Sequence, residues 1–246
     1  MRLLLFVSVV SVLLVRVSCA QQREPAQITQ QKEPAHTVNC EPDNRDQEAD
    51  EPHCLLQLRG LATRSGDLLH LTLENGATKT FKDERAACKR HDVAKCVSYR
   101  LAAYYPAQRL FVVEVGVYES FSVIAVHRRS GSVTRLDDHP HMAPGGKRFV
   151  TAFSSEAWET ERNIGIYYIA SDSLKLEWEY RARDYEIWNF VAWDGDDRVE
   201  LTVMSHVKDS SRKSELETRR AEVRRTAAGW RLNKDLGERD EPQQRR

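Results

Sequence analysis

Short apolar runs separated by turn residues dominate the chain from Cys54 onward. The segment Leu68–Glu74 alternates apolar and polar residues, and Asn75-Gly76 separates it from a second alternating run at Thr78–Phe81. Asn-Gly between alternating runs is the strongest short-range signal for a β-hairpin, because a type I′ turn needs two residues that tolerate positive φ. The pattern therefore predicts consecutive antiparallel strands.

Other segments of the chain repeat this arrangement of two apolar runs around a turn. They are Phe121–His127 with Ser132–Leu136, Ile164–Ala170 with Leu174–Tyr180, and Phe190–Trp193 with Val199–Met204. Asp83–Ala94 is the one clearly helical pattern. Ser214–Arg225 begins with a capping box, but a turn and a closing strand follow it, so we favour a hairpin over a helix there.

A weak internal repeat organises these hairpins. Strands open at Arg109–Val113, Arg148–Ala152 and Asn189–Trp193, which start 39 and then 41 residues apart. Units of about 40 residues made of consecutive antiparallel strands have the size of propeller blades. About 13 strands are expected between residues 54 and 233, which makes three to four units. We therefore expect a mainly β fold, an antiparallel meander of 3-4 repeated units that is small or partial propeller-like, with a β-sandwich as the alternative.

One of these units also carries a recognisable motif. His141–Val150 resembles the "SPDGKR plus apolar strand" motif of WD40-like and TolB-type β-propeller repeats, with Ala143 in place of the motif's Ser and Gly145 in place of its Asp. The resemblance covers about ten residues of a single unit. It implies a scaffold for binding and points to no particular member of these families.

The first 53 residues have a different composition. Leu3–Val15 is an apolar run too short to span a membrane, and it ends in small residues, so residues 1–20 are expected to be a secretory signal peptide cut before Gln21. A lipid anchor at Cys19 is the alternative. Residues 21–53 hold four prolines, no glycine and a charge of −5 from three basic and eight acidic residues, which predicts a disordered linker. The β-rich domain is expected at 54–233, and a flexible charged tail at 234–246.

Cysteine usage supports export. Without Cys19, four cysteines remain: Cys40, Cys54, Cys88 and Cys96. In an oxidising compartment they are expected to form two disulfides, for which three connectivities exist. Cys40–Cys54 and Cys88–Cys96 are the local choices. The chain has no N-x-S/T sequon, which together with the short leader fits a periplasmic or secreted protein of a bacterial envelope.

Charge argues against nucleic acid as the partner. The chain has 37 basic and 37 acidic residues, so it has no excess of positive charge. Residues 207–231 carry eight basic and four acidic residues, but these do not form a basic stripe with interleaved aromatic residues. We interpret this segment as a solvated edge strand that its charges protect from aggregation.

Motifs for catalysis are absent from the sequence, which contains no G-x-S-x-G, no phosphate-binding glycine loop and no H-E-x-x-H. His139, His141 and Asp137 form the densest group of potential metal ligands, although a solvated turn explains them more simply. We expect no cofactor and no enzymatic activity. A metal-dependent hydrolase that uses the two histidines is the least favoured alternative.

Aromatic residues beside acids suggest a binding surface. Such pairs follow the first strand of each repeat at Tyr118-Glu119, Trp158-Glu159 and Trp193-Asp194. If the units are arranged like blades, the three connections lie at one end and form a rim, and Tyr and Trp are enriched among interface anchors. The leading hypothesis is a non-enzymatic extracytoplasmic module that binds another protein of the cell envelope, as an accessory factor, an inhibitor or an immunity-type protein. The alternative is a glycan or cell-wall ligand binder that uses Tyr118, Trp158 and Trp188.

Overall fold

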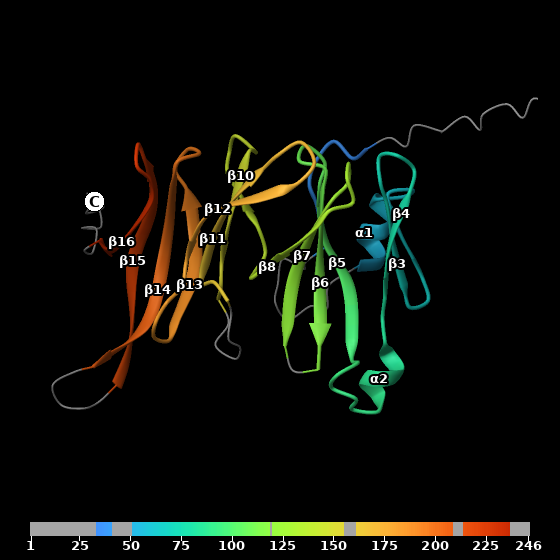
Figure 1. The fold of residues 1–246 in the computed structure, drawn as a ribbon, viewed down its shortest axis with the longest axis horizontal. Helices are drawn as coiled ribbons and strands as arrows, with labels where there is room; N and C mark the ends of the chain where they lie inside the picture. Colours follow the sequence, from blue (N-terminus) through green and yellow to red (C-terminus); the bar gives the residue numbers. More distant parts are fainter. Residues whose placement is uncertain (1–32, 41–50, 119, 155–160, 209–213, 237–246) are drawn as a thin grey trace, which may run out of the picture. The chain divides into compact units, whose positions relative to one another are not determined.

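The computed structural model describes residues 33–40, 51–118, 120–154, 161–208 and 214–236. These residues form sixteen strands and two short helices, and every strand pair is antiparallel (Figure 1). The expected mainly β fold is confirmed. The strands form four separate sheets, none of which closes into a barrel.

The first two sheets come from the N-terminal half of the chain. The N-terminal sheet has the order β2 (Ala62–Ser65), β3 (Leu68–Thr72) and β4 (Thr78–Lys82). The second sheet has the order β1 (Val38–Asn39), β5 (Val97–Tyr105), β6 (Leu110–Val117), β7 (Phe121–His127) and β8 (Val133–Leu136). Helix α1 (Glu51–Gln57) precedes β2, and helix α2 (Arg85–Lys89) connects the two sheets.

The other two sheets are meanders of four strands. The third sheet contains β9 (His141–Met142), β10 (Arg148–Ala152), β11 (Ile164–Ile169) and β12 (Leu174–Tyr180). The fourth contains β13 (Glu186–Trp193), β14 (Arg198–Lys208), β15 (Ser214–Thr226) and β16 (Gly229–Leu236). In both sheets the spatial order of the strands follows the chain (Figure 1).

Apolar side chains from neighbouring sheets bury one another in three clusters. One cluster joins the N-terminal sheet to the second sheet, with Leu69 and Leu71 against Phe111 and Val113. The next joins the second sheet to the third and includes the ring stack of Phe149 on Tyr167, whose centroids are 4.8 Å apart. The last joins the third sheet to the fourth around the buried Trp188. The second and third sheets therefore bury both of their faces.

The repeat is present, but its boundaries differ from those expected. β5–β8, β9–β12 and β13–β16 are successive units of four strands. Of the three runs expected to open a unit, Arg109–Val113 and Arg148–Ala152 belong to the second strand, and only Asn189–Trp193 belongs to the first. The short β9 explains why the expected units begin at different strands. A strand of two residues leaves no periodic signal in the sequence, so β9 was not counted when the units were divided.

The Asn75-Gly76 hairpin joins β3 to β4 as expected, but its turn is not type I′. Among the described residues, positive φ outside glycine occurs only at His91 and Arg109, so Asn75 has an ordinary φ, whereas Gly76 has φ +80°. The N–H of Gly76 donates to the Leu73 carbonyl, and that of Leu73 donates to the Ala77 carbonyl. This is the three-residue hairpin loop with a glycine bulge, since Leu73 pairs with Ala77 and residues 74–76 form the loop.

The expected linker contains folded residues, which corrects the boundary at residue 54. Val38 and Asn39 pair with Tyr104 and Ala103 at the edge of the second sheet, and Val38 is buried. Within the same segment Glu33 forms an ion pair with the buried Arg128. Helix α1 also begins before residue 54. A few apolar residues and a disulfide are enough to hold this polar segment against the sheet. The composition averaged over residues 21–53 did not reveal these few contacts.

Two other boundaries also differ. The helix expected at Asp83–Ala94 is limited to Arg85–Lys89, and turns follow it up to Cys96. At the C-terminal side, β16 continues to Leu236, beyond the expected domain end at 233. The preference for strands at 214–225 is confirmed. However, β15 pairs with both β14 and β16, so it is an inner strand and not the expected edge.

Candidate functional site

Both expected disulfides are present and lie close to the candidate site. Cys40 pairs with Cys54, which ties the segment of β1 to helix α1. Cys88 pairs with Cys96, which closes the loop between α2 and β5. The structure thus selects the two local pairs from the three possible connectivities.

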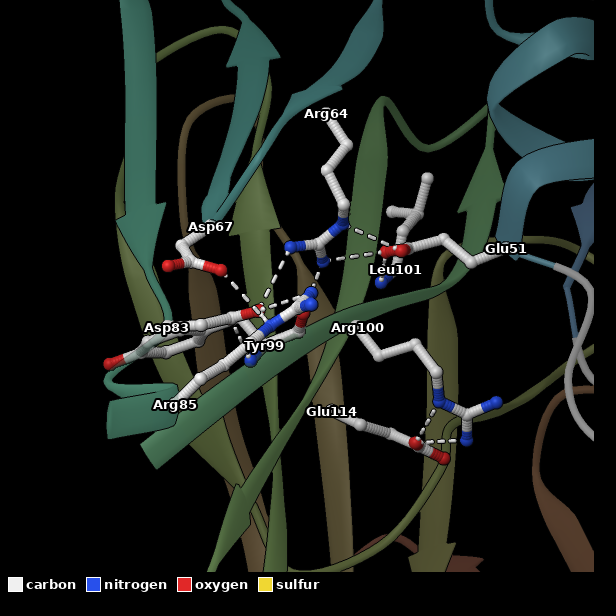
Figure 2. Close-up of polar contacts among 9 residues, drawn as sticks. All are labelled: Glu51, Arg64, Asp67, Asp83, Arg85, Tyr99, Arg100, Leu101 and Glu114. Atoms are coloured by element: carbon white, nitrogen blue, oxygen red, sulfur yellow. Dashed lines mark hydrogen bonds and ion pairs between the residues drawn. The ribbon is translucent and has the colours of Figure 1, made fainter. Parts of the chain in front are cut away.

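Among the described residues, no strand pairs with the outer side of the first half of β5, because β1 pairs only with Ala103 and Tyr104. Other groups take up the free backbone positions of this edge (Figure 2). Asp83 Oδ1 accepts from the Tyr99 N–H at 2.8 Å, and Glu51 Oε1 accepts from the Leu101 N–H at 2.8 Å. Arg64 donates to the Tyr99 carbonyl. Side chains therefore replace a missing strand here.

Ion pairs hold these capping side chains in place. The Arg64 guanidinium donates to both Glu51 oxygens at 2.7 and 2.9 Å and to Asp83 at 3.2 Å. Asp83 is 4% exposed, and Arg85 also donates to it at 3.3 Å. Such partly buried, bidentate pairs are stronger than surface pairs. The cluster joins α1, β2 and the N-terminal end of α2 to the edge of the second sheet.

A pocket of about 310 Å³ opens beside this cluster. Arg85 and Arg100 are its more exposed charged residues, with 58% and 36% of their side chains accessible. Arg100 Nε donates to Glu114 at 2.8 Å, and His139 Nε2 lies 3.1 Å from the same carboxylate. Burial opposes ionisation of Glu114, but the hydrogen bonds from His139 and Arg100 outweigh it and lower the pKa of Glu114. The two neighbouring cations therefore favour the ionised form of Glu114.

Beside the pocket, the closed loop and the end of β6 form an exposed patch of His91, Val93, Val117 and Tyr118, here called the Tyr118 patch. Val93 is 60% and Tyr118 39% exposed. The Tyr118 ring packs edge-on against His91 at 5.9 Å, and its hydroxyl lies 3.3 Å from His91 Nδ1. His91 has a left-handed backbone with φ 55°, a conformation rare outside glycine, within the loop that Cys88–Cys96 closes.

The predicted aromatic rim is not assembled at one end of the sheets. Tyr118 follows the C-terminal end of β6, whereas Trp193 and Asp194 lie near the opposite end. There Asp196 accepts from the N–H of Gly145, which precedes β10. Trp193 is also partly buried and donates to the His141 carbonyl at 2.9 Å. Trp193 and Tyr118 lie at opposite ends because β13 is the first strand of its unit and β6 the second strand of its own, so the two strands run in opposite directions. Glu119, Trp158 and Glu159 lie outside the described residues.

The potential metal ligands are not brought together. Asp137 accepts from Arg162 at 2.6 Å, His139 contacts Glu114, and His141 stacks on Phe190 with centroids 4.1 Å apart. Among the described residues no group of three or more His, Cys, Asp or Glu is arranged to hold a metal ion. Trp188 is fully buried, so it cannot stack on a sugar ring as the glycan hypothesis required.

Sequence reasoning missed the cluster around Arg64 and Asp83. Its members come from segments that are distant along the chain, and each is an ordinary charged residue in its own segment. One sequence signal for a structural role of Asp83 was available, because Asp83 directly follows a strand and precedes a short helix. That position alone did not show that its partners were the N–H of Tyr99 and the guanidinium of Arg64.

Comparisons with known proteins leave the family open. No family model matches the sequence, and no curated protein or solved structure is similar to it. The resemblance of His141–Val150 to propeller repeats therefore stays a prediction. Within the described part of the chain, no helix is long and apolar enough to cross a membrane.

Proposed function

We propose that the protein binds another protein outside the cytoplasm through the Tyr118 patch and the adjacent arginine pocket. The observation that carries this proposal is an exposed tyrosine with apolar neighbours, held by a disulfide-closed loop and flanked by exposed arginines. Tyrosine and arginine are enriched among the residues that dominate binding energy at interfaces.

Pre-organisation strengthens this proposal. The disulfide and the contact with His91 restrict Tyr118 before any partner arrives, so less side-chain entropy is lost on binding. Arg85 lies on α2, three residues before Cys88, and so connects the pocket to the patch. The pocket offers charge and the patch offers apolar surface, which is the composition of a protein-binding site with a polar rim.

The two disulfides fit an oxidising compartment, and with the apolar leader they support export. We further propose that residues 1–20 are a signal peptide and that the mature protein resides in the periplasm or is secreted. A lipoprotein anchored at Cys19 is the variant of this proposal that keeps the same compartment. The partner is then a component of the cell envelope or a secreted effector.

Affinity capture from an envelope extract, followed by a binding titration with the captured partner, tests this function. We expect Tyr118→Ala to weaken binding by at least about tenfold, the effect of losing an anchor residue. Tyr185→Ala is the matched control, because Tyr185 is 43% exposed in the connection between β12 and β13. Trp158→Ala tests the predicted residue that lies outside the described chain.

Equal partner profiles for Tyr118→Ala and the unchanged protein would contradict the assignment of this surface. Mass spectrometry of the same purified protein reports on export. A chain that starts at Gln21 supports the signal peptide, a lipid-modified Cys19 supports the anchored variant, and an intact Met1 in the folded, exported protein would refute both.

A further inference from the structure

A second pocket, of about 320 Å³, lies at the end of β6 opposite Tyr118. It is surrounded by the turns that follow β5, β7, β9 and β11. Gln108 Nε2 donates to the Gly146 carbonyl at 3.2 Å, and the Ser132 hydroxyl donates to the Asp172 carbonyl at 3.0 Å. These bonds connect turns of the second sheet to turns of the third, so the pocket walls are fixed relative to each other.

The described lining of this pocket contains three cationic residues, Arg109, Arg129 and Lys147, and no carboxylate. The two arginine side chains are 41% and 47% exposed. The Lys147 ammonium has no ion-pair partner within the described ranges of the chain. Three like charges around one pocket repel each other, and this repulsion is relieved when an anion binds.

Glu74 holds the two arginines in position. Its carboxylate lies 3.1 Å from Arg109 Nε and 3.3 Å from Arg129 Nε. It neutralises one of the three positive charges, which leaves two. Asp172 stands in the neighbouring turn, where it accepts from the Ser173 hydroxyl at 3.0 Å, and it does not line the pocket. The lining with Glu74 is therefore suited to a ligand group of two negative charges.

The backbone around the pocket is also unusual. Arg109 has φ 53°, a left-handed conformation that is costly for a residue with a side chain and that is concentrated at functional sites. Gly146 has φ +66°, and a Cβ there would lie 2.5 Å from Gln108 Nε2. The turn thus requires glycine at 146. Both residues also stand in turns that join neighbouring strands: the Gly146 N–H donates to the Ala143 carbonyl, and the Arg109 carbonyl accepts from the Arg128 N–H.

At the inner side of the pocket lies a buried polar group. His127 is only 2% exposed, and its ring forms a hydrogen bond with the backbone of Ala170, whereas its Nδ1 has no hydrogen-bond partner among the described residues. A buried polar group without a partner is rare and costs stability. His127 therefore forms part of the fixed wall of the pocket.

We infer that this pocket binds a phosphate group, either free or as a small monoester. Arginine presents planar pairs of N–H donors that match phosphate oxygens, and lysine adds a point charge. A phosphate dianion matches the two uncompensated positive charges, whereas a monocarboxylate leaves one of them unbalanced. The site shares no residue with the Tyr118 patch, so either proposal can fail without the other.

Calorimetric titration of the purified protein at constant ionic strength tests the inference. The probes are inorganic phosphate, glycerol 3-phosphate and acetate. We expect one saturable site for inorganic phosphate, for the monoester or for both, with acetate binding at least about tenfold more weakly. Lys147→Ala should weaken phosphate binding by about tenfold, the effect of one lost charge-assisted contact. Lys147 is exposed, so this change leaves the core intact.

Lys89→Ala, an exposed lysine on α2 at the other end of the sheet, is the matched control and should bind as the unchanged protein does. Arg129→Ala provides a second, independent variant with the same expected loss. The inference is overturned if no phosphate probe saturates, if acetate binds as tightly as phosphate, or if Lys147→Ala and Arg129→Ala both keep full affinity.

Discussion

Several buried polar atoms lack partners, and they show how strongly apolar packing dominates this chain at the scale of single residues. Among the described residues, the hydroxyls of Tyr104 and Tyr167 are buried without a hydrogen bond. Burial raises the pKa of each of these tyrosines to about 12, so both hydroxyls stay protonated and both donors stay unsatisfied. Their rings nevertheless pack in the cores between sheets, where Tyr104 lies tilted against Phe111 and Tyr167 stacks on Phe149.

Tyr104→Phe and Tyr167→Phe are therefore expected to raise the free energy of unfolding, by about 1 kcal/mol each, because they remove an unpaired hydroxyl and keep the ring. Tyr180→Phe is the matched control, since its hydroxyl donates to Glu186 at 3.1 Å and accepts from Lys234. It should lower the free energy of unfolding. Urea denaturation measures all three, and a loss of stability in both Tyr104→Phe and Tyr167→Phe would show that their hydroxyls do have partners.

At the scale of elements, the edge of β5 shows how side chains can satisfy the backbone groups of a strand that has no neighbour. An open edge can pair with another chain, and proteins block such edges with charged side chains. Here the side chains of Glu51, Arg64 and Asp83 bond directly to the edge, so the N–H and carbonyl of Tyr99 and the N–H of Leu101 are satisfied by side chains. Because Asp83 is almost fully buried, this arrangement depends on it more than on the exposed carboxylates around it.

Asp83→Ala is expected to lower the free energy of unfolding by about 2–4 kcal/mol, because it leaves the Tyr99 N–H and part of Arg64 without partners. Asp67→Ala is the control. Asp67 pairs with Arg85 at 3.1 Å but is 50% exposed, and exposed pairs contribute less than about 1 kcal/mol. Denaturant titrations of both variants measure the difference, and equal losses would mean that burial does not set the contribution of these carboxylates.

At the scale of the whole described unit, each sheet contacts only its neighbours, as in repeat proteins. The fourth sheet ends this series with a polar outer face, where Arg198 pairs with Glu222 at 2.7 Å and Arg220 pairs with Glu200 at 3.3 Å. The outer face of the N-terminal sheet carries the pair His70 and Thr80. Polar outer faces let a series of sheets end in water without a further partner.

Stability is therefore expected to be distributed along the series. Leu71→Ala removes a buried side chain between the N-terminal and second sheets, and Leu201→Ala removes one between the third and fourth. Each should cost about 2–5 kcal/mol locally. Hydrogen exchange should show faster exchange in β2–β4 for the first and in β13–β16 for the second, with the opposite end unchanged. Equal acceleration in all four sheets for both variants would indicate a single cooperative unit.

The sequence by itself determined the class of fold and most of its strands, because the side chains of a strand alternate between faces and turn residues interrupt this pattern wherever the chain reverses. It also limited the disulfides to four cysteines with two local pairs. Tyr118 was named as a candidate in this way, since an aromatic residue after a strand is visible along the chain. These are local properties, and local properties can be read from a sequence.

Only the tertiary structure decided the rest. The capping of β5 joins Glu51, Arg64 and Asp83, and the cationic pocket joins Arg109, Arg129 and Lys147, in both cases across segments that no local pattern connects. The direction of β13 separated Trp193 from Tyr118. Because the short β9 was not visible in the sequence, the repeated segment was placed on equivalent strands, whereas it lies on the first strand of the fourth sheet and on a later strand of the others. Which side chains meet depends on register and strand direction, and these are set by the packing of whole sheets.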